Sequence, residues 1–239
     1  MYNPIILWNT VVSMSSSKIE SERQTAADKV FELLHEEIMS LQLMPGAKIS
    51  EADIAHRFNM SRQPVRDAFN RLAWLDLVLI RPQRATIVRG FSEKKIAEAR
   101  FVRLSVELEV IRDASQNWNS TFTEKSMQIL QQQMTAIREQ RWVDFHALDF
   151  DFHAQLCQFA GRPCVVNIIQ SCRQQTDRLL NLSFKGSAEG DECIDDHRQV
   201  IMALDKHDFK HASNVLRAHF AHLDLIVERI RAAHSNFFY

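Results

Sequence analysis

The chain has 239 residues, enough for two modest domains that each bury a core of their own. Apolar residues make up 46% and charged residues 25%, as in ordinary globular proteins, and the low numbers of glycine and proline, five of each, favour helix over strand. The net charge of -1 excludes a chain-wide cationic field, so binding to nucleic acid would require a local basic patch.

Residues 1–22 are predicted to form a loose tail. Their apolar run, Ile5 to Val12, is too short to span a bilayer and has neither a basic leader nor a small-residue cleavage site, so no membrane association is expected. The cysteines show no C-x-x-C spacing and are interpreted as reduced thiols, which indicates a cytoplasmic protein; they are Cys157, Cys164, Cys172 and Cys193.

Residues 23–90 have the pattern of a DNA-binding domain of the helix-turn-helix type. A helical stripe of apolar residues runs from about Thr25 to Leu41 and ends at the turn Pro45-Gly46. A capping-box-like start at Ser50 opens a short helix, and the turn Asn59-Met60 leads into a second one. Two short helices joined by a tight turn predict a helix-turn-helix.

The second of these helices, Ser61 to Leu75, is the centre of the motif. Ser61 suits the N-cap position, and Pro64 falls in the first turn, where its missing N–H costs nothing. By spacing, one face is apolar and holds Val65, Ala68, Phe69, Leu72 and Leu75. The opposite face carries Arg62, Gln63, Arg66, Asn70 and Arg71. Such a face can read base edges and phosphates in a major groove, although the pattern also fits a solvated amphipathic helix.

A small β-hairpin, or wing, is predicted next. Two short β-prone runs, Leu77–Arg81 and Thr86–Arg89, flank a turn that carries Arg84. Between Ser50 and Gly90 the arginines outnumber the acidic residues and supply the local basic patch; they are Arg57, Arg62, Arg66, Arg71, Arg81, Arg84 and Arg89.

Residues 91–239 are predicted to form an all-helical second domain. Helices are expected at about 96–115, 123–140, 142–160, 165–184, 193–207 and 209–233. Short connections between them favour an antiparallel bundle, so the predicted fold is mostly α, with an N-terminal winged helix-turn-helix followed by an all-α antiparallel helical bundle. The first of these helices is apolar on more than one face, which indicates burial or a subunit interface.

Three of the predicted bundle helices bring polar side chains to an apolar inner face. Asp149 and His153 are four residues apart on one helix, His197 lies on another, and His219 and His222 lie on the last. Burial without partners would cost several kcal/mol, whereas a shared divalent metal would remove that cost. Imidazole nitrogens with one carboxylate suit Zn²⁺, Ni²⁺, Mn²⁺ or Fe²⁺. Spacing alone does not choose between His219 and His222, and each histidine taken singly also fits a hydrogen-bonded core or surface residue.

These motifs resemble a known family. The stretches MPGAKISEADIAHRFNMSRQPVRDAFNRL and IRPQRATIV resemble the winged-helix domain of GntR-type bacterial transcription regulators. The stretches VRLSVELEVIRDAS, ALDFDFHAQLCQFAGRP, DDHRQVIMAL and VLRAHF resemble the FCD ligand-binding domain of the FadR-like subgroup. The resemblance implies a DNA-binding transcription regulator, more often a repressor than an activator, that binds a pseudo-palindromic operator as a homodimer.

The resemblance also implies roles for individual residues. The family pattern of metal ligands is filled by Asp149, His153, His197 and His219, which implies a retained metal site. Arg103 matches an arginine that faces the effector pocket, and its fork suits a carboxylate. An ion pair between Arg103 and Glu107, four residues later, accounts for this arginine equally well.

For DNA binding, the resemblance carries over Arg62 and Arg66, with Gln63 nearby. The full predicted set, which includes the cap of the helix, its outer face and the wing, is Ser61, Arg62, Gln63, Arg66, Arg71 and Arg84. Three positions depart from the family: Ala52, where some relatives carry arginine, and Asp76 and Ala85, where glycine is usual.

The predicted function is transcription regulation controlled by a small organic acid bound at the metal site. A sugar acid, a hydroxycarboxylate or a dicarboxylate is expected, because a polar metal pocket disfavours a long acyl chain. Two alternatives stay open: the metal is purely structural with no small-acid effector, or the chain is a metal-dependent hydrolase. The second is disfavoured, since no separate general base or nucleophile motif lies near the cluster, and the chain is not predicted to be an enzyme.

Overall fold

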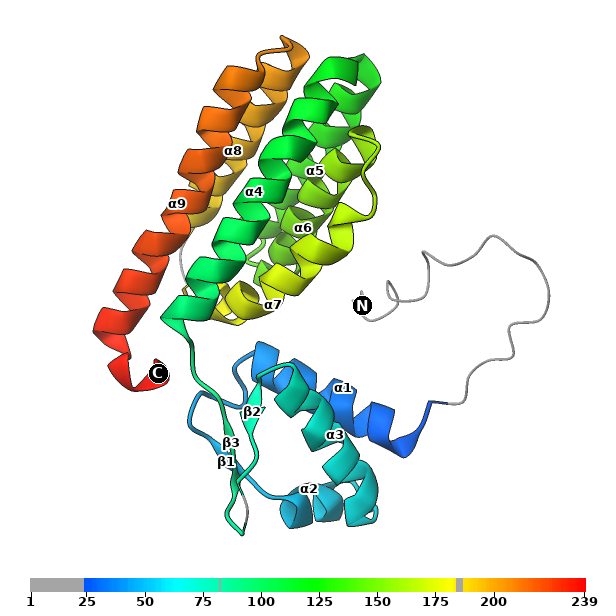
Figure 1. The fold of residues 1–239 in the computed structure, drawn as a ribbon, viewed down its shortest axis with the longest axis vertical. Helices are drawn as coiled ribbons and strands as arrows, with labels where there is room; N and C mark the ends of the chain where they lie inside the picture. Colours follow the sequence, from blue (N-terminus) through cyan, green and yellow to red (C-terminus); the bar gives the residue numbers. More distant parts are fainter. Residues whose placement is uncertain (1–23, 82, 184–186) are drawn as a thin grey trace, which may run out of the picture.

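The structure is a computed structural model that describes residues 24–81, 83–183 and 187–239. Figure 1 shows a smaller part built from residues 24–88 and a larger helical bundle built from residues 93 onward. The predicted tail, residues 1–22, lies outside the described residues, and so do residues 184–186, at the end of the predicted helix 165–184 and before the one at 193–207. No helix among the described residues is long and apolar enough to cross a membrane.

The smaller part contains the predicted helix-turn-helix. Its helices are α1 (Ala26–Met39), α2 (Glu51–Arg57) and α3 (Arg62–Trp74). The Ser50 hydroxyl accepts a hydrogen bond from the backbone N–H of Asp53 at 3.1 Å, as its capping pattern predicted. Ser61 is the N-cap residue of α3, but its side chain makes no capping hydrogen bond and is exposed. Its hydroxyl therefore contributes little to starting the helix.

A three-stranded antiparallel sheet completes the smaller part. It consists of β1 (Lys48–Ile49), β2 (Val78–Leu79) and β3 (Thr86–Val88), in the order β1-β3-β2. Strands β2 and β3 form the predicted wing, although each is shorter than predicted. Strand β1 was not predicted, because two residues carry no detectable alternation of apolar and polar side chains. It pairs Lys48 with Ile87 of β3 and so ties the loop before α2 to the wing.

The smaller part has its own apolar core. Four of the five residues predicted for the inner face of α3 are fully buried, namely Val65, Ala68, Phe69 and Leu72, while Leu75, the C-cap residue, is half-buried. They pack with residues from α1, α2 and the sheet: Val30, Leu34, Ile38, Ile49, Ile54, Ala55, Leu77, Val78 and Val88. This packing fixes α3 with its polar face outward.

The larger part is a bundle of long helices with short connections. They are α4 (Glu93–Asn117), α5 (Ser120–Arg138), α6 (Trp142–Phe159), α7 (Val165–Ser183), α8 (Ser187–Asp205) and α9 (Phe209–Ala233), followed by the short 3-10 helix η2 (Ser235–Phe237). Helix α4 packs against α6, α7 and α9, and α5 packs against α6 and α8. Figure 1 shows α4 and α9 side by side, both reaching down to the smaller part. The predicted fold class is confirmed.

Helix α8 differs from its predicted bounds, because it begins at Ser187 rather than at Cys193. Gly190 and its acidic neighbours fall in the gap between the predicted helices 165–184 and 193–207. In the structure Gly190 is buried where α8 meets α5, and a Cβ there would lie 2.6 Å from Ile137 Cδ1. A close approach between two helices, rather than a turn, accounts for this glycine.

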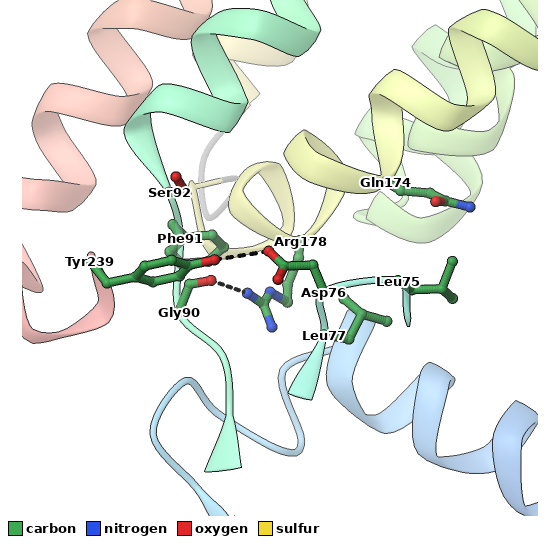
Figure 2. Close-up of a pocket in the computed structure, with 9 residues that line it drawn as sticks. All are labelled: Leu75, Asp76, Leu77, Gly90, Phe91, Ser92, Gln174, Arg178 and Tyr239. Carbon is green, nitrogen blue, oxygen red and sulfur yellow. Dashed lines mark hydrogen bonds between the residues drawn. The ribbon is translucent and has the colours of Figure 1, made fainter. Parts of the chain in front are cut away.

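The end of the chain packs against the linker between the two parts. The backbone N–H of Phe91 donates to the Phe237 carbonyl at 2.7 Å, and that of Tyr239 donates to the Phe91 carbonyl at 3.0 Å. Arg178 of α7 donates to the Gly90 carbonyl at 2.8 Å (Figure 2). The segment that follows α9 therefore holds the linker in place.

Asp76 joins the smaller part to this junction. It has a φ of 60°, in the left-handed region, which glycine adopts more readily than residues with a side chain. Its carboxylate accepts a hydrogen bond from the Tyr239 hydroxyl at 2.8 Å, which Figure 2 shows. It also accepts one from Lys95 at 2.6 Å and pairs with Arg89 at 2.8 Å. Burial alone would raise the pKa of Asp76, but these donors outweigh it and lower the pKa. The contacts offset the conformational cost of a side chain here.

The junction predicts a destabilising effect for Gly90→Ala. A Cβ on Gly90 would overlap the carbonyl oxygen of Phe237, which is the acceptor for Phe91. Because backbone must move, we expect the free energy of unfolding to fall by about 1–3 kcal/mol, measured by urea denaturation. Gly190→Ala is the matched control, with a smaller expected loss, because only the flexible end of Ile137 must shift and the gain of about 0.5–1 kcal/mol from alanine in a helix offsets part of that cost. Equal effects of the two variants would contradict the close contact at Gly90.

Candidate metal site and DNA-reading surface

The predicted metal-binding residues come from three helices of the bundle. Asp149 and His153 lie one turn apart on α6, His197 lies on α8 and His219 on α9. Asp149, His153 and His197 are buried, and His219 is half-buried. Helix packing thus gathers these polar groups at one place in the bundle interior.

The ligand-type atoms converge on one oxygen of Asp149. Its Oδ1 lies 3.6 Å from His197 Nε2 and 3.9 Å from His153 Nε2. The ring centroids of His197 and His219 are 4.9 Å apart. Ligand atoms of Asp149, His197, His219 and also Cys193 lie within 4.8 Å of one another. Bonds from a metal to its ligands are about 2.0–2.3 Å long, which places the ligand atoms closer to one another than 4.8 Å. A small inward movement of these side chains would therefore bring the ligand atoms around one divalent ion.

In each imidazole of the cluster, an oxygen atom of a neighbouring side chain faces Nδ1. The pairs are His153 with Glu107 Oε2 at 2.5 Å, His197 with Gln133 Oε1 at 3.3 Å, and His219 with Asp196 Oδ2 at 3.3 Å. An acceptor at Nδ1 keeps the proton there and leaves Nε2 for a metal. Nε2 of His153 is buried and has no hydrogen-bond partner among the described residues. The residues present therefore fit a divalent metal.

The other oxygen of Asp149 is held by Arg173 of α7. Arg173 Nη1 donates to Asp149 Oδ2, and Nη2 donates to the His146 carbonyl at 2.9 Å. Both Asp149 and Arg173 are buried. Burial alone would raise the pKa of Asp149, but the Arg173 guanidinium outweighs it and holds the pKa well below its usual range. Asp149 thus stays ionised with Oδ1 directed at the cluster.

Burial also favours the neutral form of the His153 and His197 imidazoles. It lowers the pKa of His197 well below the usual value and lowers that of His153, although Glu107 and Asp149 oppose the shift at His153. Neutral imidazole is the form that binds a metal. The cluster is therefore ready to accept a cation at neutral pH.

Sequence reasoning missed Cys193, which belongs to the cluster. Its Sγ lies 3.6 Å from Asp149 Oδ1 and 3.9 Å from His197 Nε2. Its place four residues before His197, on the same helical face, was a signal in the sequence. Both residues lie in the helix predicted at 193–207, but the predicted ligands were limited to imidazoles and a carboxylate. Burial raises the pKa of this thiol well above its usual value.

The outer partners of the imidazoles were also missed, and they distinguish two candidate histidines. His222 faces the same carboxylate as His219, with Nδ1 3.4 Å from Asp196 Oδ2, but its side chain is 41% exposed against 13% for His219. The structure thus brings His219 into the converging set, while His222 lies toward the solvent.

Arg103 of α4 is linked to the cluster through Glu107. Its Nε donates to Glu107 Oε1 at 2.6 Å, and Oε2 of that carboxylate is the oxygen behind His153. Burial alone would raise the pKa of Glu107, but Arg103 and His153 hold it at about 2. The guanidinium lies over the Phe220 ring at 4.9 Å, and its Nη2 is buried without a hydrogen-bond partner among the described residues. The predicted ion pair with Glu107 is present, and it does not use the Nη2 group of Arg103.

The predicted DNA-binding residues of α3 lie mostly on its outer face. Ser61, Arg62, Gln63 and Arg66 are exposed near the start of the helix. Arg66 forms a two-point ion pair with Glu51 of α2, with hydrogen bonds of 3.1 and 2.9 Å. This face therefore presents guanidinium and amide groups, with Arg66 held in place by a neighbouring carboxylate.

The remaining two predicted residues lie apart from this group. Arg71 faces α1, where it pairs with Asp28 at 2.7 Å and lies 4.0 Å over the Phe31 ring. Arg84 is exposed in the wing turn. The helix start and the wing tip are thus open to a nucleic acid, while Arg71 is engaged within the domain.

Comparisons with known proteins agree with both parts of the fold. Residues 26–88 match the family model described as bacterial regulatory proteins, gntR family, and residues 98–222 match the model of the FCD domain. The fold is similar to the solved structure of E. coli McbR/YncC, with a TM-score of 0.66 and 18% identity over 86% of this chain and 98% of that one.

Curated relatives carry regulator names. The HTH-type transcriptional repressor RspR of Escherichia coli strain K12 is 30% identical over 215 residues, covering 90% of this chain and 94% of the relative. A probable D-xylose utilization operon transcriptional repressor of Paenarthrobacter nicotinovorans is 27% identical over 208 residues, covering 87% and 91%. The resemblance drawn from the sequence is confirmed: the chain belongs to the GntR family of bacterial transcription regulators, which are not enzymes, and its helical bundle is an FCD domain.

Proposed function

We propose that a small carboxylate, bound beside a divalent metal in the bundle, controls the affinity of this regulator for its operator. The observation that carries the proposal is the line of contacts from Arg103 through Glu107 to His153. At one end is a buried guanidinium N–H with no partner among the described residues. At the other is the cluster of metal-binding side chains. An added carboxylate that accepts from this N–H and also binds the metal would satisfy both.

Asp149, His153, His197 and His219 would hold the metal, which is Zn²⁺, Ni²⁺, Mn²⁺ or Fe²⁺ by donor chemistry. When bound, the ion supplies positive charge and a coordination position for an anion. Glu107, Gln133 and Asp196 orient the imidazoles, and Arg173 orients the carboxylate.

The effector is proposed to be a sugar acid, a hydroxycarboxylate or a dicarboxylate. The Arg103 fork fits a carboxylate, and the charged and polar cluster disfavours a long acyl chain. The name of the Paenarthrobacter relative connects that protein with D-xylose utilization, which agrees with a sugar-derived ligand class.

The operator contacts are proposed to come from residues 23–90, with residues 91–239 as the effector and dimerisation domain and residues 1–22 as a tail. Ser61, Arg62, Gln63 and Arg66 would enter the major groove, and Arg84 would reach the backbone from the wing. Arg71 would contact a phosphate only if its pair with Asp28 opened. A regulator that acts on the chromosome of a bacterium works in the cytoplasm.

A homodimer on a pseudo-palindromic operator is proposed from the apolar surface of the bundle. Phe101 of α4 is 72% exposed and Leu225 of the neighbouring α9 is 64% exposed. Large exposed apolar groups on adjacent helices are typical of interfaces. Phe101→Glu should therefore shift the protein toward monomer in analytical ultracentrifugation, and an unchanged dimer would place the interface elsewhere.

The proposal is tested by fluorescence anisotropy on DNA from upstream of the gene, at fixed salt, with a panel of small carboxylates. We expect one acid to change the affinity when Zn²⁺ is present and to have no effect after chelation. His219→Ala should abolish the response, whereas His222→Ala, one turn away and more exposed, should retain it. If metal raises the melting temperature but no acid acts at any concentration, the metal is structural and the effector proposal fails.

Arg66→Ala should weaken specific DNA binding. If Arg66 reads a base, we expect a loss of about 1–3 kcal/mol that is confined to the specific operator. Equal weakening on every sequence, with a shallower dependence on salt, would identify a phosphate contact instead. Arg112→Ala is the control, since Arg112 lies in the bundle and pairs with Glu109 on its own helix.

A further inference from the structure

Cys193 has surroundings that a cysteine used only for packing would not need. Its sulfur contacts a carboxylate oxygen at 3.6 Å and an imidazole nitrogen at 3.9 Å. Unligated buried cysteines usually behave as small apolar side chains. Here the thiol instead lies among the groups that the proposed function assigns to a metal.

The geometry of the cluster favours the sulfur as a donor. The four ligand-type atoms that lie within 4.8 Å of one another belong to Asp149, Cys193, His197 and His219. Cys193 and His197 are one turn apart on α8, so both side chains leave the helix toward the same point. The buried Nε2 of His153, which has no hydrogen-bond partner in the described part of the chain, lies 3.9 Å from the same Asp149 oxygen.

We propose that Cys193 Sγ is a ligand of the metal in this chain and that it selects a thiophilic ion, Zn²⁺ in preference to Mn²⁺. The inference rests on the metal site of the proposed function. On binding, the S–H bond breaks as the metal–sulfur bond forms, and the proton passes to solvent. Soft thiolate favours Zn²⁺, whereas Mn²⁺ prefers carboxylate, carbonyl and water oxygens.

The test is cobalt substitution of the full-length protein. Co²⁺ gives visible d–d bands with any donor set and adds an intense near-ultraviolet charge-transfer band only when a thiolate is bound. We expect both in the unchanged protein. Cys193→Ser should lose the charge-transfer band and keep the d–d bands. Cys164→Ser, at an exposed cysteine, should keep both and serves as the matched control.

Metal competition gives a second measurement. Cys193→Ser should lower the affinity for Zn²⁺ by about tenfold or more and leave the affinity for Mn²⁺ nearly unchanged. If the unchanged protein shows d–d bands without the charge-transfer band, Cys193 is not a ligand and the inference fails while the metal site stands. If equilibrium dialysis finds no bound Co²⁺ or Zn²⁺ at all, the metal site of the proposed function fails as well.

Discussion

Arg173→Met should lower the free energy of unfolding of the metal-free protein by about 3–5 kcal/mol, because it leaves the buried Asp149 carboxylate without its partner. Arg173 and Asp149 are both buried, and the guanidinium also donates to the His146 carbonyl and pairs with Asp177. Methionine fills much of the same volume but supplies no charge and no donor. The effect is measured by urea denaturation in the presence of a chelator.

Saturating Zn²⁺ should recover part of this loss, since a cation beside Asp149 Oδ1 restores a positive neighbour to the carboxylate. Arg162→Met is the control. Arg162 pairs with Asp113 at 2.8 Å, but its side chain is 60% exposed, so we expect a cost below about 1 kcal/mol. A loss for Arg173→Met as small as that of the control would mean that the Asp149 pair is solvated in solution.

The faces of the helices were predictable from the sequence because helical periodicity fixes which residues lie together. The inner face of α3, with Phe69 and Leu72 buried, follows from spacing alone, and so does the shared face of Asp149 and His153. Which helices face one another is not contained in that periodicity. The resemblance to the GntR and FCD sequences supplied the link between α6, α8 and α9.

The parts that were not predicted depend on contacts between elements distant in sequence. Glu107 and Gln133 stand behind imidazoles of other helices, and only the packing of α4 and α5 against the cluster places them there. The pairing of Phe91 with the chain end has no local signal at all. Asp76 was recognised as a departure from the family, but the donors that stabilise it come from Lys95 and Tyr239 in the other part of the chain.

Acidification should destabilise the metal-free protein well before its carboxylates titrate. Burial lowers the pKa of His146 to about 4 and also lowers the pKa values of His153 and His197. These imidazoles are neutral in both states above pH about 6.5, the pKa of an unfolded histidine. Below that pH the unfolded chain binds protons that the folded protein does not, so the free energy of unfolding falls as pH falls.

For His146 alone, the shift from 6.5 to about 4 corresponds to a loss of about 3 kcal/mol, complete near pH 4. Glu107, with its pKa held at about 2, adds a further loss as pH falls from about 4.5 towards 2, since its folded-state pKa is depressed and the unfolded chain protonates first.

Urea denaturation between pH 7.5 and about 4.5 with a chelator measures the histidine contribution. His146→Leu should flatten the pH dependence, and His211→Gln, at an exposed histidine, should leave it as it is. If the free energy of unfolding stays constant over this range, the buried histidines have the same pKa values in the folded protein as in the unfolded chain. That result would contradict the neutral state of the imidazoles at the candidate metal site.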